Sequence, residues 1–350
     1  MTTLTSLVVP TPESELWRYS RIGELHLGDY RSAAVFTHVE GAAVSSDSQI
    51  DLGSVSSEDP DVFEAYNAEH AQVVRVATKR GEVLQAPIVV KHSLNDSGIV
   101  CTPLLEIDAA ENSEITLVEH FSSDDDVKSL IIPSVRIRAA QSARVTYVQV
   151  NELGRATWSI GYQRASGERD SSISTSTIAL GGDYARVRAA VRLVGTGASA
   201  RQVALYFADG TQMHDFRTLQ DHVAPRTRSD LLFKGAVKDT AKSVYTGLIK
   251  IRDTADKSEA FQTNRNLTLS SGAWAESVPN LEIETNDVKC SHASTVGPID
   301  DEQRFYLESR GIRPEVAERL VVFGFFADVI DRLPAAAQPD VLRQKVGARI

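Results

Sequence analysis

The fold is decided by the stretch Ile107-Asp-Ala-Ala-Glu-Asn-Ser-Glu-Ile-Thr-Leu-Val118, which returns in altered form 30 residues later as Ile137-Arg-Ala-Ala-Gln-Ser-Ala-Arg-Val-Thr-Tyr-Val148. The first apolar residue after each small-residue turn continues this period, at separations of 30, 28 and 30 residues, through Ile115, Val145, Ile173 and Val203. Stacked repeats of this length cover one another's apolar side and form one continuous core. Because no helical pattern falls within the period, we expect a β-helix.

The sequence around this repeat supports the same fold. Short alternating runs such as Val145–Val150 and Leu281–Glu284 are separated by small polar turns, which is typical of strands. Ala109-Ala110 and Ala139-Ala140 are expected at tight corners between coils. A β-sandwich is the alternative, since its strands are also short and evenly spaced. We predict a mainly β protein with an irregular N-terminal segment at residues 1–70, a β-helix core at 71–297 and a C-terminal α-helical domain at 298–350.

The two flanks differ in character. Acidic and Ser-rich stretches, including Ser45–Ser48, suggest an irregular N-terminal segment. At the other end, Asp300 can cap a helix that stops at Gly311, and Pro314 can open a second helix. The second helix carries more apolar residues than one core-facing stripe needs. We expect another protein to cover part of it, or the helix to fold back over the open end of the solenoid.

Composition excludes several classes of function. The 350 residues include 37 basic and 47 acidic side chains, a formal net charge of −10, which argues against nucleic-acid binding. The apolar run 320–327 is too short to cross a bilayer, so we expect no membrane span. The N-terminus lacks the features of a secretory signal, and we expect a cytoplasmic protein. Two cysteines, Cys101 and Cys290, cannot form a disulfide framework.

Other chemical motifs give weak signals. No phosphate-binding loop is present, so we expect no ATP hydrolysis by this chain. The run Asp124–Asp126 could bind Ca²⁺, as in β-helix enzymes that act on polysaccharides, although a solvated loop is the more ordinary interpretation. His214 and His222 could converge on a metal, but their spacing matches no ligand signature, and hydrogen-bonded structural roles are favoured.

Cys290-Ser-His292 is the sharper candidate. Residues two apart in extended chain project to the same face, so the thiol and the imidazole would point the same way. Both groups are ligands that iron and iron–sulfur clusters accept. Two ligands cannot close such a site, so this pair would bind metal incompletely, transiently or with a partner. On spacing alone, a buried cysteine beside a hydrogen-bonded histidine is favoured.

The residues also resemble a known family. Asn280–Gly297, continuing through Asp300–Ile312, is similar to the C-terminal signature of SufD-type chains in the SufB/SufD family of iron–sulfur cluster assembly subunits. Asp209–Asp215, Thr227–Gly235 and Glu15–Tyr19 look like the same family. SufB-type chains carry a key cysteine in a Phe-Tyr-Cys stretch, where this sequence reads Phe305-Tyr306-Leu307. The resemblance therefore favours the SufD type.

The resemblance implies a right-handed parallel β-helix with helical ends, acting as a non-catalytic scaffold. It implies pairing with a SufB-like β-helix and docking on a SufC-like ABC ATPase, which would hydrolyse ATP in place of this chain. His292 would contribute to a transient, nascent Fe–S cluster shared with the partner subunit, and Cys290 is the less secure second ligand. The implied ATPase-binding residues of the C-terminal helices are Arg310, Gly311, Pro314, Leu320, Phe323, Phe325, Phe326, Val329 and Ile330.

Two further functions remain open at this point. A SufB-like homodimeric scaffold would hold clusters by itself, and a homodimer is conceivable for the isolated chain. A stand-alone β-helix polysaccharide lyase or hydrolase would use Asp124, Asp125 and Asp126 and depend on Ca²⁺. Iron and sulfide analysis separates the first from a SufD-type subunit, and Ca²⁺-dependent turnover would identify the second.

Overall fold

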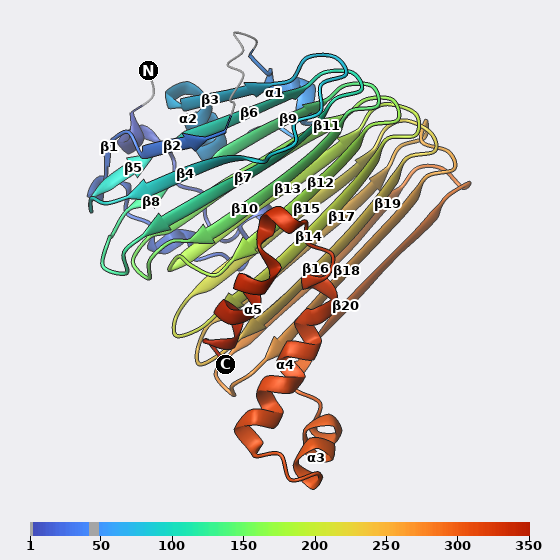
Figure 1. Ribbon diagram of the computed structural model, residues 1–350. Coiled ribbons are helices and arrows are strands. Elements are labelled where there is room, and N and C mark those ends of the chain that lie inside the picture. Colours follow the sequence, from blue (N-terminus) through green and yellow to red (C-terminus); the bar gives the residue numbers. More distant parts are fainter. Residues whose placement is uncertain (1–2, 42–48) are drawn as a thin grey trace.

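A computed structural model describes residues 3–41 and 49–350, and its central feature is a parallel β-solenoid of about eight turns (Figure 1). The predicted Ser-rich stretch at 45–48 lies outside the described residues. Successive coils pair in register, so that Val145 aligns with Ile115 on one side and with Ile173 on the other. The predicted solenoid is confirmed, and the β-sandwich alternative is wrong because these strands pair in parallel along the stack.

Two sheets form the walls of the solenoid. Within the described residues, sheet A comprises β1 (Arg31–Ser32), β3 (Gln72–Ala77), β5 (Ile99–Cys101), β6 (Pro103–Ala109), β8 (Leu130–Ile131), β9 (Ser134–Ala139), β11 (Trp158–Gly167), β13 (Tyr184–Leu193), β15 (Met213–His222), β17 (Lys242–Ile251) and β19 (Trp274–Ile283). Sheet B comprises β2 (Phe36–Glu40), β4 (Ile88–Leu94), β7 (Glu114–Ser123), β10 (Arg144–Glu152), β12 (Ser172–Ala179), β14 (Ser199–Ala208), β16 (Arg228–Val237), β18 (Glu259–Thr268) and β20 (Lys289–Pro298).

The coil lengths vary at the turns, and this corrects one predicted repeat position. Ile173 pairs with Ala200, whereas Val203 pairs with Ser176. The sequence pattern placed Val203 opposite Ile173, three residues beyond the true partner. The true partner is Ala200, a small residue that fills the equivalent inner position on β14. A residue with a positive backbone φ angle recurs at one corner of successive coils, at Asn112, Ser142, Asp170, Gly197, Arg226 and Lys257.

The interior of the solenoid changes along its length. The early coils enclose aliphatic side chains such as Ile115, Leu117 and Val145, which are almost fully buried. The later coils enclose aromatic rings, including Tyr206 and Tyr245, together with buried amides and hydroxyl groups. The lumen thus becomes more polar toward the C-terminal end, and its polar groups are mostly joined by internal hydrogen bonds.

The N-terminal segment lies on the outer face of sheet A and contains more structure than the sequence indicated. Its short 3-10 helices are η1 (Leu4–Ser6), η2 (Glu15–Trp17), η3 (Ile22–Glu24) and η4 (Leu27–Asp29), and its α-helices are α1 (Leu52–Val55) and α2 (Val62–His70). Trp17 and Phe63 pack against Tyr162 and Tyr184 of sheet A. At this end β2 pairs antiparallel with β4, so the first edge of sheet B is covered by the chain itself.

Buried arginines tie the N-terminal segment to sheet A. Arg164 donates two hydrogen bonds to Glu64 of α2, at 2.8 and 2.7 Å, and both side chains are almost fully buried. Arg186 pairs with Asp215, and its guanidinium lies 4.1 Å from the ring centre of Trp17. Because each buried cation meets a buried carboxylate, its loss of hydration is compensated.

The C-terminal helices are α3 (Asp301–Ser309), α4 (Pro314–Ile330) and α5 (Pro339–Gly347), with the 3-10 helix η5 (Ala335–Ala337) between the last two. Asp300 accepts hydrogen bonds from the amides of Glu302 and Gln303, and Gly311 has a φ of +82°, so the predicted cap and stop are confirmed. Pro314 is the first residue of α4, as expected.

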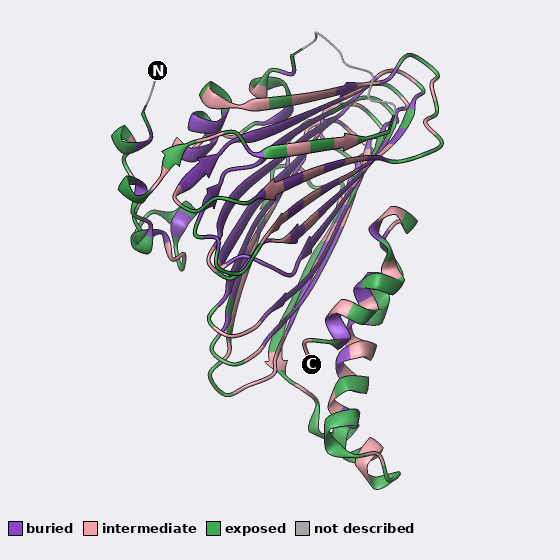
Figure 2. Ribbon diagram, turned by 60° about the vertical axis from the view of Figure 1, so that its left-hand side comes forward, coloured by how far each residue is buried: buried purple, intermediate pink, exposed green. Residues whose placement is uncertain are grey.

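The position of α4 corrects another expectation. Its buried face packs on the outer surface of sheet B, against residues such as Val203, Leu205 and Leu232, rather than over the open end of the solenoid. Figure 2 shows this division, with buried residues where α4 and α5 meet the sheet and exposed residues along the projecting α3. No helix within residues 3–41 and 49–350 therefore caps the last coil.

Candidate metal half-site at the open end

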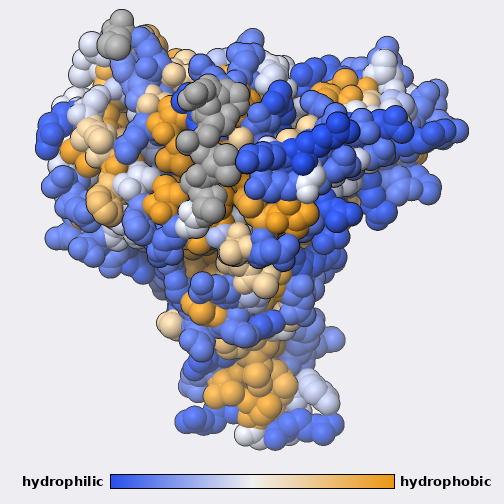
Figure 3. All heavy atoms as spheres, turned by 45° about the horizontal axis from the view of Figure 1, so that its top comes forward, coloured by the Kyte–Doolittle hydropathy of each residue, from blue (hydrophilic) through white to orange (hydrophobic). Residues whose placement is uncertain are grey.

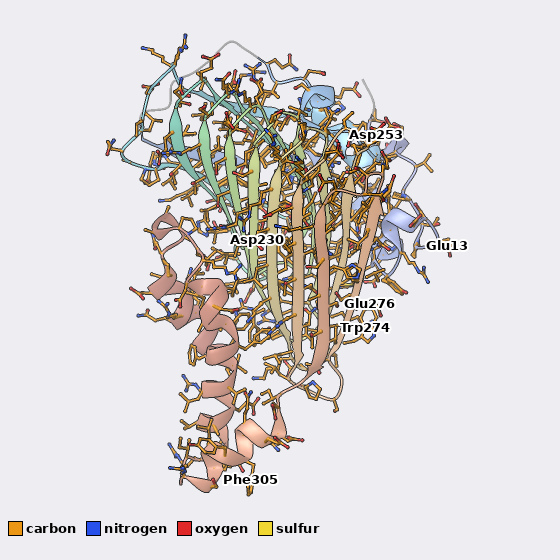
Figure 4. The ribbon with its side chains drawn as sticks, turned by 90° about the vertical axis from the view of Figure 1, so that its right-hand side faces the viewer. Glu13, Asp230, Asp253, Trp274, Glu276 and Phe305 are labelled. Atoms are coloured by element: carbon orange, nitrogen blue, oxygen red, sulfur yellow. The ribbon has the colours of Figure 1, made fainter. Side chains whose placement is uncertain are left out.

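The last coil consists of β19 and β20, and each is the final strand of its sheet. In β18, the inner positions Ala260, Gln262 and Asn264 are buried, because β20 covers them. The equivalent positions of β20 are Cys290, His292 and Ser294, paired in register with those three residues. Figure 4 looks toward this end of the molecule, where Trp274 and Glu276 mark β19.

Cys290 and His292 therefore lie on the same inner face of the last coil, as their spacing predicted. The side chain of His292 is exposed, and among the described residues the structure gives it no hydrogen bond or ion pair. Ser294 donates a 2.7 Å hydrogen bond to the hydroxyl of Ser277, which crosses the lumen from β20 to β19. The histidine is thus held on an ordered strand while its ring remains accessible at the end of the stack.

Cys290 is half-buried and packs against a small apolar cluster that includes Ile249 and Ile251. Burial raises the pKa of its thiol above the ordinary value. The thiol is consequently protonated at neutral pH and becomes a good ligand when a metal displaces its proton. Cys290 is therefore a weaker candidate ligand than His292 in the free chain.

Cys290 and His292 are too few to close a metal site by themselves. Within residues 3–41 and 49–350, no group of three or more His, Cys, Asp or Glu side chains is arranged to hold a metal ion. A closed zinc or iron–sulfur site takes four protein ligands in most cases. A second molecule that stacks on β19 and β20 could supply the others, because the edge of the last coil is accessible.

The weaker candidates are placed elsewhere. His214 and His222 lie on β15 and are fully buried. The ring of His214 contacts the carbonyl of Gly181 at 3.2 Å, and that of His222 lies 2.7 Å from the hydroxyls of both Thr227 and Ser229. These contacts give the two histidines structural roles.

The acidic run Asp124–Asp126 also has an ordinary placement. It forms an exposed turn after β7, and Asp125 accepts a hydrogen bond from the amide of Arg155. It is not part of any three-residue metal cluster in the described chain.

The candidate ATPase-binding residues fall into two groups. Phe326, Val329 and Ile330 are buried against sheet B, and Phe323 is partly buried next to Gly347 of α5. An intramolecular contact therefore accounts for the apolar character of these residues, and their contact with a partner stays a prediction. Leu320 is 46% exposed, and Arg310, Gly311 and Pro314 are also exposed at the turn between α3 and α4.

The exposed group belongs to a projecting helical hairpin. Phe305, in the middle of α3, is 70% exposed and Tyr306 is 57% exposed (Figure 4). Hydrophobic residues gather at this end of the molecule in the space-filling view (Figure 3). A groove of about 1040 Å³ lies between this hairpin and the outer face of β18 and β20. The hairpin thus presents an apolar surface close to the last coil.

One anchoring residue was missed by the sequence analysis. Lys234 of β16 is buried beneath α4, where it donates a 2.8 Å hydrogen bond to the carbonyl of Phe325 and pairs with Asp328 at 2.5 Å. Its ammonium also lies 4.7 Å from the ring centre of Phe325. A lysine on the outer face of a strand normally indicates solvent exposure, so no local pattern indicated this contact.

No helix within the described residues has both the length and the apolar character that spanning a bilayer requires.

Comparison with known proteins identifies the family. Residues 92–325 match the family model described as SUF system FeS cluster assembly, SufBD core domain. An iron–sulfur cluster assembly SufBD family protein of Mycobacterium tuberculosis (strain ATCC 25618 / H37Rv) is 33% identical over 362 residues, covering 98% of this chain and 88% of the relative.

Relatives named iron–sulfur cluster assembly protein SufD are similar over shorter alignments. That of Escherichia coli (strain K12) is 30% identical over 284 residues, covering 79% of this chain and 66% of the relative. The SufD protein of Bacillus subtilis (strain 168) is 32% identical over 248 residues, covering 70% of this chain and 56% of the relative. The chain belongs to the SufBD family of the SUF iron–sulfur cluster assembly system.

Proposed function

We propose that this chain is a SufD-type, non-catalytic scaffold subunit whose last coil pairs with the β-solenoid of a SufB-like subunit. The observation that carries the proposal is the uncovered edge of β19 and β20, with His292 and Cys290 on its inner face. An exposed strand edge has unpaired N–H and C=O groups and readily pairs with another chain. The opposite end of sheet B is already covered by β2.

In this proposal the nascent Fe–S cluster is cargo that forms between the two subunits. His292 supplies a neutral imidazole, and the partner supplies the remaining ligands, thiolates among them. Cys290 lies two residues away on the same face and can contribute once metal displaces its proton. Protonation of the imidazole removes the lone pair that ligates metal, so acid should weaken this contribution.

The C-terminal hairpin is the proposed docking surface for a SufC-like ABC ATPase. Its exposed apolar side chains Phe305 and Leu320 support this assignment, together with Arg310, Gly311 and Pro314 at the turn. ATP hydrolysis would belong to the partner. Because α4 is anchored on sheet B through Lys234, movement of the ATPase would be transmitted to the solenoid wall that ends in β20.

The test is reconstitution of cluster assembly with purified SufB-like and SufC-like partners. We expect His292→Ala to abolish or strongly reduce cluster formation while the complex still assembles. His38→Ala is the matched control, because His38 is also exposed but lies on β2 at the other end of the solenoid. Cluster formation by His292→Ala at the rate of the control would contradict the role of His292.

A further inference from the structure

Gln262 is a buried amide directly beneath His292. It lies on the inner face of β18, is 2% exposed and pairs in register with His292 on β20. Neither its Oε1 nor its Nε2 atom has a hydrogen-bond partner among the described residues. Buried side-chain amides are normally hydrogen-bonded, because leaving such a group unpaired costs free energy. Both functional atoms of Gln262 are therefore available at the base of the half-site.

The opposite wall leaves room for this amide. Gly247 lies on β17, and a Cβ atom there would come within 2.4 Å of Nε2 of Gln262 and of the Tyr245 hydroxyl. A side chain at 247 would force the amide of Gln262 or the phenol of Tyr245 to shift. The absence of a side chain thus allows Gln262 to extend across the lumen under the last coil.

We propose that Gln262 is a positioning residue for His292, an inference that rests on the proposed function. Its Oε1 accepts a hydrogen bond from one ring N–H of His292, which leaves the lone pair of the other ring nitrogen free for metal at the open end. A neutral imidazole has one N–H and one ring nitrogen with a free lone pair, and a metal-ligating histidine commonly donates a hydrogen bond from the N–H of its second nitrogen to an oxygen acceptor.

The placement of Gln262 fits this role. Adjacent strands in a sheet lie about 4.8 Å apart, which brings side chains in register on one face within reach of each other. Gln262 is the residue of β18 in register with His292, and its carbonyl oxygen is unused. The amide is also fixed by burial, so it can select one tautomer of a ring that is otherwise exposed.

The chain provides a matched control in Gln202. Gln202 of β14, Leu231 of β16, Gln262 and His292 form one row of in-register positions. Gln202 is also buried and also has an unpartnered Oε1 atom. It lies three strands from His292, or roughly 14 Å at ordinary strand spacing, which is too far for a direct contact.

The experiment measures the tautomer of His292 by long-range ¹H–¹⁵N correlation in the full chain labelled with ¹⁵N-histidine, with His292→Ala to assign the signals. At pH 8 we expect one neutral tautomer in the wild type and in Gln202→Leu, but a mixture of both in Gln262→Leu. Gln262→Glu keeps an acceptor oxygen and should keep the wild-type tautomer. A tautomer ratio unchanged by Gln262→Leu, or changed equally by Gln262→Glu, would overturn the proposal.

A second readout connects the tautomer to assembly. In the reconstituted complex, Gln262→Leu should lower cluster formation about 10- to 100-fold, as expected when the acceptor behind a ligating histidine is lost. The proposed function can fail independently of the positioning role. In that case His292→Ala would still assemble clusters, although the tautomer of His292 would still depend on Gln262. An assembly rate for Gln262→Leu equal to that of Gln202→Leu would contradict the positioning role.

Discussion

Acid should destabilise this fold through His214 and His222. Burial lowers the pKa of each imidazole to about 4, from an ordinary value of 6.5. The folded state therefore binds fewer protons than the unfolded state between pH 4 and 6.5, and stability is lost as the pH falls through this window. Between pH 7.5 and 5, each histidine should reduce the free energy of unfolding by about 2 kcal/mol.

The assay is urea unfolding of the wild type and of His222→Gln at both pH values. Glutamine can hydrogen-bond to Thr227 and Ser229 but does not titrate, so the pH-dependent loss should be about 2 kcal/mol smaller than in the wild type. In the double variant His214→Gln/His222→Gln, the reduction of the pH-dependent loss should be about twice as large. The two histidines lie at opposite ends of β15 and should act independently. Equal losses in the wild type and both variants would refute the reasoning.

Two further perturbations test the packing. Gly235→Ala should destabilise the fold by about 1–3 kcal/mol, because the new Cβ atom would lie 1.8 Å from the Tyr206 ring. In the control variant Gly297→Ala, the new Cβ atom has no other atom within 4 Å, so the free energy of unfolding should change by less than about 0.5 kcal/mol. Equal urea midpoints for the two variants would contradict this prediction. Arg164→Met should lower the free energy of unfolding by about 3–5 kcal/mol and expose the N-terminal segment to proteolysis, because Glu64 is left buried and unpaired. Adding Glu64→Leu should restore much of the lost stability. A double variant that is no more stable than Arg164→Met would contradict this explanation.

The solenoid was predictable because stacking in register imposes a period on the sequence. The match between Ile115 and Val145 reflects a direct strand pairing. The period failed at Val203 because the next coil is shorter and places Ala200 opposite Ile173. Alanine is a weak marker of an inner position, so a pattern based on large apolar residues could not detect the change.

The helical ends show a similar division between local and tertiary information. The caps at Asp300 and Gly311 and the start at Pro314 follow from the conformations of single residues, and all were predictable. The buried face of α4 was not, because apolar residues occur around most of this helix. Only the packed structure distinguishes the buried Phe326 from the exposed Leu320.

The candidate site was predictable only in part. The two-residue spacing of Cys290 and His292 indicates a shared face in any strand. Their position on the final, uncovered coil depends on where the stack ends, which no local pattern specifies. The unpaired amide of Gln262 beneath them depends on the register between β18 and β20 and could be found only from the structure.

The most direct test of the central claim is amide hydrogen exchange of this chain with and without a purified SufB-like subunit. If the partner continues the solenoid, amides of β20 (Lys289–Pro298) and β19 (Trp274–Ile283) should become protected, while exchange in β2 at the other end should stay unchanged. Binding of the partner with no new protection in β19 and β20 would contradict the account.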